Sequence, residues 1–330
     1  MMSTKDFEQK QVLFVFLEDG EKVSFKNDNV VVTDENGNVK HQSTCYRLFA
    51  LFIAGHVCLT SGLLERADRF GFTIVLMTYT MRVSAIIPCR AEGNVLLRRK
   101  QYAYDKPDIA AHVIANKIHN QTALLKRKRN KTDREREIIS KLEQFEKQVT
   151  TPSYSEKEIM GTEGISAKLY FGSLFSAYNW TARRPRVKQD VVNCLLDIGY
   201  TLLFNIINGL LEMYGFDTYV GILHTQFFHR KSLVCDMVEP FRPIIDAALL
   251  KALNLGQIHE KDFSKVNKQY FISGKKAAPY IHSMLDALME YKNEIFLYIQ
   301  TYYRAFMQNK PIESYPVFYF EGKEIAACKL

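Results

Sequence analysis

The sequence predicts an α+β fold in two domains: a small β-rich N-terminal domain over residues 1–92, and a larger, mainly α-helical domain over 93–330. Two observations support this division. Before Pro88, short runs rich in β-branched and aromatic residues alternate with turn residues, which is typical of strands. After Pro88, apolar residues recur at three- and four-residue spacing, which is typical of helices. We expect the first domain to mediate dimerisation and the second to carry the chemistry.

The N-terminal part holds four expected strands and one helix. The expected strands are 12–17, 30–33, 57–60 and 73–77. Asn36-Gly37 follows the second of these, and this dipeptide favours a tight hairpin turn. Residues 61–70 have helical spacing, with Leu64, Ala67 and Phe70 on one face.

The C-terminal part is expected to hold long helices and a strand-like tail. Helical patterns begin near Arg98, cover 191–216 and 280–307, and precede a strand at 317–320. The most apolar of them, 191–216, also contains asparagines and carboxylates, so it predicts a buried helix or helix pair rather than a membrane span. The basic run 126–131 has two interpretations, a solvated surface or a strip that contacts phosphates.

Composition favours an anionic partner and a reducing compartment. The net charge of +8 favours nucleic acid without identifying it. The N-terminal residues lack the apolar run of a secretory signal. The six cysteines form no Cys-x-x-Cys pair, which predicts reduced thiols in a cytoplasmic protein rather than a zinc ribbon or a disulfide framework.

The segment 221–243 concentrates ligand-type and basic side chains. They are His224, Asp236 and Glu239, together with Arg230, Lys231 and Arg242. An imidazole with hard carboxylate oxygens suits a divalent metal, and nearby cations suit a phosphate. A helix that begins near Glu239 would put that carboxylate at its positive end. A helix that begins earlier and kinks at Pro240 would place both acids on one face.

Two upstream segments complete the candidate site. Glu163 lies among glycines and apolar residues, where a carboxylate needs either an arginine partner or a metal. His224 alone fits a structural role as well as a ligand role. The basic connector is either a surface loop or a clamp on a DNA backbone, and consists of Arg183, Arg184, Arg186 and Lys188.

Five motifs occur in a fixed order along the chain. They are residues 160–164 (Met-Gly-Thr-Glu-Gly), 183–185 (Arg-Arg-Pro), 193–200, 221–225 (Gly-Ile-Leu-His-Thr) and 232–243. In this order they resemble the CRISPR-associated integrase of the spacer-acquisition step, the universal adaptation integrase family. The resemblance covers the whole chain and implies the same arrangement of a β-rich domain followed by a helical catalytic domain.

The resemblance implies a Mg²⁺ or Mn²⁺ site held by Glu163, His224 and Glu239, with Asp236 assisting. It implies a DNA integrase and endonuclease, in which a terminal 3′-hydroxyl of a short incoming DNA attacks a phosphodiester of the CRISPR repeat array. Its expected partners are double-stranded DNA, a second copy of the chain and a small ferredoxin-like adaptation protein. We expect DNA contacts from Arg183, Arg184, Arg186, Lys188, Arg230, Lys231 and Arg242.

Two alternatives stay open at this stage. One is a structure-selective nuclease that acts on branched DNA with the same metal chemistry. The other is a basic, non-catalytic DNA-binding scaffold whose carboxylates are only structural.

Overall fold

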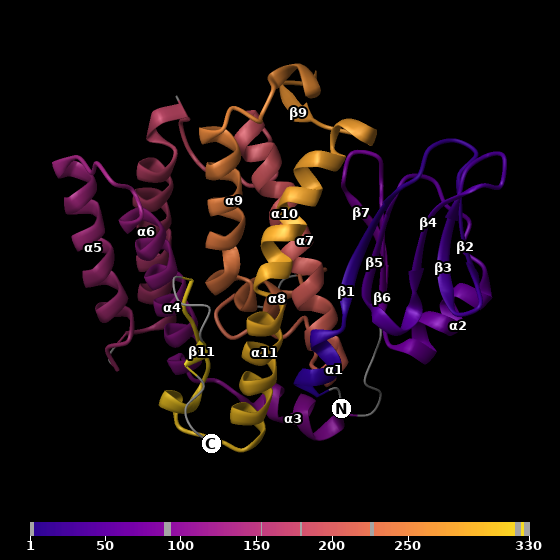
Figure 1. Cartoon of the computed structure of the whole chain (residues 1–330). Coiled ribbons are helices and arrows are strands. Elements are labelled where there is room, and N and C mark those ends of the chain that lie inside the picture. Colours follow the sequence, from indigo (N-terminus) through magenta and orange to yellow (C-terminus); the bar gives the residue numbers. More distant parts are fainter. Residues whose placement is uncertain are drawn as a thin grey trace.

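The computed structural model describes residues 3–88, 94–152, 154–178, 180–224, 228–320 and 325–326. Figure 1 shows the strands of the N-terminal part on one side of the molecule and the helices of the C-terminal part on the other. The predicted α+β class is confirmed. The predicted domain boundary at residue 92 lies outside the described residues.

Two sheets form the N-terminal part. The first has the order β1 (Gln11–Phe16), β5 (Leu48–Ala54), β6 (Thr73–Met77) and β7 (Val83–Ile87). Its first three strands are parallel neighbours, and β7 runs antiparallel to β6. The second is an antiparallel sheet of β2 (Lys22–Lys26), β3 (Asn29–Thr33) and β4 (Val39–Thr44). The hairpin expected at Asn36-Gly37 is confirmed as the β3–β4 connection.

The central strand β5 differs from the sequence prediction. The strand expected at 57–60 is wrong, because the chain there forms the irregular approach to helix α2 (Ser61–Phe70). Sequence analysis missed β5 itself. Every residue of β5 is buried, so the strand has the unbroken apolar run of a strand covered on both faces, without alternation. On α2, Leu63 and Ala67 are buried, whereas Leu64 is exposed.

The first sheet packs on the helices and shares one hydrophobic core with them. From β5, Phe52 and Ala54 join that core, whereas Leu51 and Ile53 join a second core with the smaller sheet and α2. Phe7 of the short helix α1 (Thr4–Glu8) stacks on Phe296 with ring centroids 4.3 Å apart. The β-rich part therefore buttresses the helices directly.

Helix α7 (Val191–Tyr214) is the centre of the helical part. The prediction of a buried helix is confirmed, since most of its residues are buried. Among the described residues, this one helix is long and apolar enough to cross a membrane, and 83% of its most apolar window is buried inside the protein. It packs against α9 and α10.

Among its described residues, the helical part contains further helices and four short strands. They are α3 (Val95–Ala103), α4 (Asp108–Lys126), α5 (Asp133–Val149), α6 (Glu156–Leu174), α8 (Ser232–Met237), α9 (Arg242–Asn254), α10 (Ala278–Glu290), α11 (Lys292–Met307) and the short strands β8 (Ser264–Val266), β9 (Gln269–Phe271), β10 (Val317–Phe318) and β11 (Ile325–Ala326). The single helix expected at 280–307 is wrong: it is interrupted at Tyr291, whose φ of −110° and ψ of 14° leave the helical region. No Pro or Gly signals that break in the sequence.

The tail strand folds back on its own chain. Strand β10 pairs with β11, and two asparagines on α4 bond the backbone of β10 and of the residues just after it. Asn116 and Asn120 both donate to the Phe318 carbonyl oxygen, and Phe320 N donates to Asn120 at 3.0 Å. The tail thereby closes over α4, the helix that carries part of the candidate site.

Gly199 offers a test of the packing around α7. A methyl group there would stand 2.4 Å from Ile245 Cγ2 and 3.0 Å from the Met284 sulfur, so G199A should lower the free energy of unfolding by about 1–3 kcal/mol. Gly172 on α6 has nothing within 4 Å of that position. G172A should therefore raise stability by about 0.5–1 kcal/mol through helix propensity alone. Urea denaturation measures both, and equal effects would contradict the packing described here.

Candidate metal centre

Three elements bring two glutamates to one cation. Helix α4 supplies Lys117, α6 supplies Glu163, and the 3-10 turn Glu239–Phe241 between α8 and α9 supplies Glu239. Lys117 Nζ lies 2.6 Å from Glu239 Oε2 and forms an ion pair with Glu163 Oε1. The two predicted ligands, far apart in sequence, therefore meet at a single ammonium group.

This ion-pair cluster is buried on one side and open on the other. The exposed fraction of the side chain is 6% for Lys117, 5% for Glu239 and 29% for Glu163. Burial lowers the pKa of the Lys117 ammonium, but the charges of Glu239 and Glu163 outweigh it and leave that pKa above its ordinary value. Lys117 is therefore charged, as a buried ammonium between two carboxylates must be.

Glu239 is held ionised by two cations. Besides Lys117, Arg242 Nε lies 3.0 Å from the same Oε2 atom. Burial would raise the pKa of Glu239, but Arg242 and Lys117 outweigh it and keep that pKa well below its usual range. The carboxylate is thus in the form that ligates a metal.

A buried network behind the site fixes Arg242. Its guanidinium lies 4.5 Å from the centre of the Tyr200 ring, and the Arg183 guanidinium lies 5.4 Å from the same ring. Tyr200 and Tyr170 donate hydrogen bonds to the two oxygens of Asp246, at 2.5 and 2.8 Å. Burial raises the pKa of Asp246 to about 6. The network links the basic connector to the glutamate cluster.

Asp236 organises the loop that carries His224. Its carboxylate accepts hydrogen bonds from the backbone N–H groups of Ile222 (2.7 Å), Leu223 (3.2 Å) and His224 (3.1 Å). A methyl group on Gly221 would stand 2.7 Å from Asp236 Oδ2, so only glycine fits this turn. Asp236 is therefore an anchor of the loop rather than a free ligand.

The same carboxylate orients the imidazole. His224 Nδ1 lies 2.5 Å from Asp236 Oδ1, which leaves Nε2 as the nitrogen that can face a metal. That hydrogen bond raises the pKa of His224 above its ordinary value, and the charge of Glu239 adds to the effect. Of the two glutamates, Glu239 is therefore the one whose charge acts on His224.

The residues fit a divalent ion, although they do not form a ready-made cage. Within the described ranges, no three His, Cys, Asp or Glu side chains are grouped closely enough to hold a metal. Two carboxylates and one imidazole nevertheless form the hard donor set that Mg²⁺ or Mn²⁺ takes. Glu163 and Glu239 already share one cation. The position between them is suited to positive charge.

The basic connector is tied to the start of α7. Arg183 forms an ion pair with Asp197 at 2.6 Å and a hydrogen bond with Asn193 at 3.0 Å, so its guanidinium is engaged inside the protein. The backbone N–H groups of Arg184 and Arg186 bond the same two side chains, while both arginine side chains are exposed. These two arginines are the ones available to a ligand.

The other predicted DNA-binding residues have partners within the chain. Lys188 is half-buried over Phe271, with Nζ 5.1 Å from the ring centre. Lys231 pairs with Glu212 at 2.8 Å, and Arg230 Nε donates to Ser232 at 3.2 Å.

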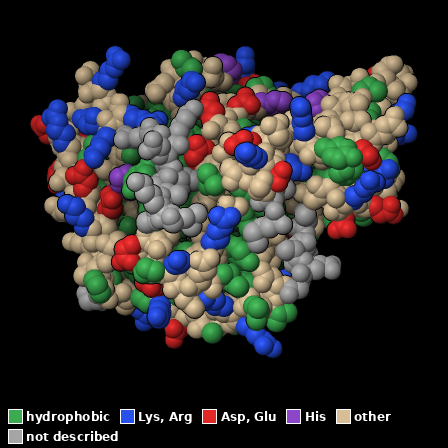
Figure 2. Space-filling model, turned by 60° about the horizontal axis from the view of Figure 1, so that its bottom comes forward, with side chains coloured by type: hydrophobic (Ala, Val, Ile, Leu, Met, Phe, Trp, Pro, Cys, Tyr) green, Lys and Arg blue, Asp and Glu red, His purple; other side chains and the backbone are tan. Residues whose placement is uncertain are grey.

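Positive charge is also not gathered into one patch on the face that Figure 2 shows. There, Lys and Arg side chains alternate with Asp and Glu. On that face, contact with an anionic ligand would therefore depend on local basic segments.

The structure combines parts of the two geometries expected around Pro240: a helix starts before it, a 3-10 turn begins at Glu239, and the expected common face of Asp236 and Glu239 is wrong. Helix α8 ends at Met237, the chain is interrupted at the turn containing Pro240, and α9 begins at Arg242. Both Asp236 and Glu239 are buried, but they face different partners: Asp236 the His224 loop, and Glu239 the Lys117 ammonium.

Sequence reasoning missed Lys117. A signal was present, because Lys117 falls in a stripe with Val113, Asn120 and Leu124 on the buried face of α4. A lysine in such a stripe needs a carboxylate partner. Tyr170 and Asp246 gave no comparable signal, since a tyrosine and an aspartate within long helices have no distinctive spacing.

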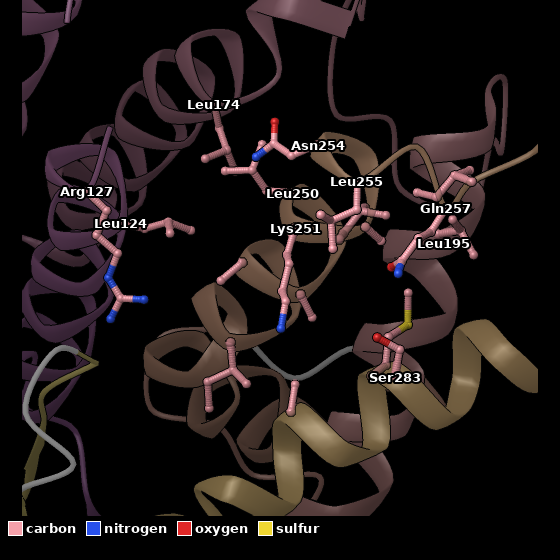
Figure 3. Close-up of a pocket in the computed structure, with 18 of the residues that line it drawn as sticks. Leu124, Arg127, Leu174, Leu195, Leu250, Lys251, Asn254, Leu255, Gln257 and Ser283 are labelled. Atoms are coloured by element: carbon pink, nitrogen blue, oxygen red, sulfur yellow. The ribbon is translucent and has the colours of Figure 1, made fainter. Parts of the chain in front are cut away.

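A large hollow in the described part of the chain lies away from these residues. It has a volume of about 1320 Å³ and opens between α9, α10 and the ends of α4 and α6. Figure 3 shows its mostly apolar lining, with Arg127 and Lys251 among leucines. None of its lining residues is a candidate ligand.

Comparison with known proteins gives one consistent result. A family model described as CRISPR associated protein Cas1 matches residues 14–284. A CRISPR-associated endonuclease Cas1 from Rhodospirillum rubrum is 29% identical over 263 residues, which cover 73% of this chain and 76% of that protein. One from Chlorobaculum tepidum is 33% identical over 232 residues, covering 63% of this chain and 66% of that protein.

Solved structures share the fold. A CAS1 protein from Thermotoga maritima superposes with a TM-score of 0.78 at 20% identity, covering 90% of this chain and 97% of that one. A casposase bound to integration product gives 0.75 at 20% identity, covering 91% of each chain. A Cas6-RT-Cas1–Cas2 complex gives 0.79 at 20% identity over 94% of this chain, which spans 36% of that longer one.

Asp236→Asn tests the anchoring role of this carboxylate. The amide cannot accept all four hydrogen bonds, so the free energy of unfolding should fall by about 1–3 kcal/mol. The pKa of His224, followed by NMR and assigned with H224Q, should fall toward its ordinary value.

The pH dependence of that loss follows from the raised pKa of His224. Below the pKa that His224 has in the unfolded chain, the pair of charged His224 and Asp236 contributes its full stabilisation. This stabilisation is lost as the pH rises through the higher pKa that His224 has in the folded protein. The stability difference between wild type and D236N should therefore be larger at pH 6 than at pH 9. The opposite trend, or an unchanged His224 pKa, would count against the pairing.

Proposed function

The chain belongs to the Cas1 family of CRISPR-associated proteins, and from this premise we propose that it is a divalent-metal-dependent DNA integrase and endonuclease. In the proposed reaction, the terminal 3′-hydroxyl of a short incoming DNA attacks a phosphodiester at the edge of a CRISPR repeat. One phosphodiester forms as another breaks, so the step needs no ATP. Relatives named as Cas1 endonucleases support the nuclease part of the proposal.

The convergence of Glu163 and Glu239 on one cation, with His224 nearby, carries this proposal. These three residues would hold the Mg²⁺ or Mn²⁺ ion, which supplies Lewis acidity to the phosphoryl oxygens. Asp236 engages Nδ1 of the His224 ring, so Nε2 is the nitrogen left to bind an ion. Lys117 and Arg242 keep Glu239 ionised before the ion arrives.

The basic connector would hold the DNA backbone beside this site. Arg184 and Arg186 are exposed and have backbones fixed by Asn193 and Asp197, which presents their side chains outward. Arg183 is a positioning residue in this proposal, because its guanidinium is engaged by Asp197 and lies over the Tyr200 ring. Phosphate contacts of this kind position the substrate without reading its sequence.

We also propose that the chain works as a homodimer together with a small ferredoxin-like adaptation protein, in the cytoplasm. The solved Cas1–Cas2 complexes with the same fold support a partner of this kind.

Glu163→Gln tests the chemistry. Purified protein is incubated with Mn²⁺, a hydroxyl-ended duplex and a supercoiled repeat array. We expect the wild type to join the duplex to the array and E163Q to lose at least about 100-fold in rate, since a metal ligand is removed. Glu156→Gln, an exposed glutamate on the same helix, should keep full activity.

The same assay separates the alternatives. Cleavage of branched DNA without joining would favour a structure-selective nuclease. Binding of DNA without any cutting or joining would overturn the enzymatic proposal and favour a scaffold.

The double variant R184A/R186A tests the clamp. Loss of two phosphate contacts should weaken DNA binding for every sequence and reduce the slope of log K against log salt by about two. Fluorescence anisotropy at several salt concentrations measures this slope. Lys22→Ala/Lys26→Ala, which removes equal charge from β2, is the matched control. Equal slopes for both double variants would contradict the proposed contact of Arg184 and Arg186 with the DNA backbone.

A further inference from the structure

The ammonium group of Lys117 lies between two of the predicted metal ligands. It contacts Glu163 and Glu239 at once, and its side chain is almost fully buried. In the proposed reaction Lys117 contacts no substrate, and its only part, shared with Arg242, is to keep Glu239 charged. A buried cation with two carboxylate partners inside a candidate metal centre therefore calls for its own role.

We propose that Lys117 is a resident cation: it holds Glu163 and Glu239 together in the metal-free protein, and a divalent ion displaces it on binding. This inference rests on the proposed function in one respect, namely that these glutamates are metal ligands. It adds that the protein carries its own competitor for the metal.

The distances around Lys117 imply that a bound metal ion would displace its ammonium group. Lys117 Nζ lies 2.6 Å from Glu239 Oε2, and Mg²⁺ binds carboxylate oxygens at about 2.0–2.1 Å. An ion bound between the two glutamates would therefore stand close to the ammonium and repel it. Two like charges cannot share this position at low dielectric.

Lys117, rather than Arg242, is the side chain that moves away when the metal ion binds. Arg242 contacts only Glu239 of the pair and is fixed by the Tyr200 ring at 4.5 Å. Lys117 contacts both glutamates and has a flexible four-carbon stem that allows the ammonium to move. The site also opens on the side of Glu163, whose side chain is 29% exposed.

The resident cation gives the site its shape before the metal arrives. Two adjacent carboxylates without a cation between them would repel each other. With Lys117 between them and Arg242 beside Glu239, the two carboxylates are held next to each other. The consequence is that the two glutamates are already paired before an ion binds, and that the competition with Lys117 reduces their affinity for it.

The decisive measurement is Mn²⁺ affinity without DNA, by calorimetry or by EPR of free Mn²⁺. Lys117→Met removes the competitor, so we expect Mn²⁺ to bind at least about tenfold more tightly than to the wild type. Lys117→Gln, whose amide can still bond the glutamates, serves as a second neutral variant if the methionine variant does not fold. Lys117→Arg keeps the charge and should stay within about threefold of the wild type.

Lys126→Met is the matched control. It removes the same charge from the same helix, but Lys126 is exposed and pairs with Glu143. Its Mn²⁺ affinity should be unchanged. Thermal unfolding adds a second readout: metal-free K117M should melt below the wild type, and saturating Mn²⁺ should raise its melting temperature by more than that of the wild type.

The outcomes separate this inference from the proposed function. If Glu163→Gln leaves Mn²⁺ binding unchanged in an otherwise wild-type chain, the glutamates are not ligands and the proposed metal centre fails. If E163Q weakens Mn²⁺ binding but neither neutral Lys117 variant tightens it, the metal centre stands and the resident-cation role is overturned.

Discussion

Charge compensation among buried side chains is the constraint on which this structure depends. Glu239 is almost fully buried and is tolerated there only because Lys117 and Arg242 contact the same carboxylate oxygen. Lys117, in turn, is tolerated because Glu163 is its second partner. Helices α4 and α6 and the turn before α9 must therefore meet at one point, and the site can form only when the whole helical part is folded.

Two irregular loops near the site are held by hydrogen bonds from their backbone N–H groups to carboxylate and amide side chains. Asp236 binds three consecutive backbone N–H groups of the His224 loop. Asn193 and Asp197, on the buried helix α7, bind the backbone of the basic connector in the same way. These hydrogen bonds hold the loop side chains in fixed positions, as a helix would. Both a metal ligand and the arginines that would contact a DNA backbone need such fixed positions.

The sequence predicted the α+β class, the buried helix α7 and the meeting of Glu163 with Glu239, because these rest on periodicity and on ordered motifs. It could not give β5, whose uniform burial removes the alternation that marks a strand. The break between α10 and α11 at Tyr291 could not be predicted either, because no Pro or Gly marks it in the sequence. The place of Lys117 in the site was not predicted either, because it depends on two glutamates that are distant from it in the sequence.

Pulsed EPR of Mn²⁺ bound to the wild-type protein tests the central claim most directly, because it reports the atoms around the ion. If Glu163, His224 and Glu239 hold one ion, the spectrum must show coupling to a single imidazole nitrogen, and this coupling must vanish in H224A. Bound Mn²⁺ without nitrogen coupling, or with coupling that survives in H224A, would contradict a centre built from these three residues.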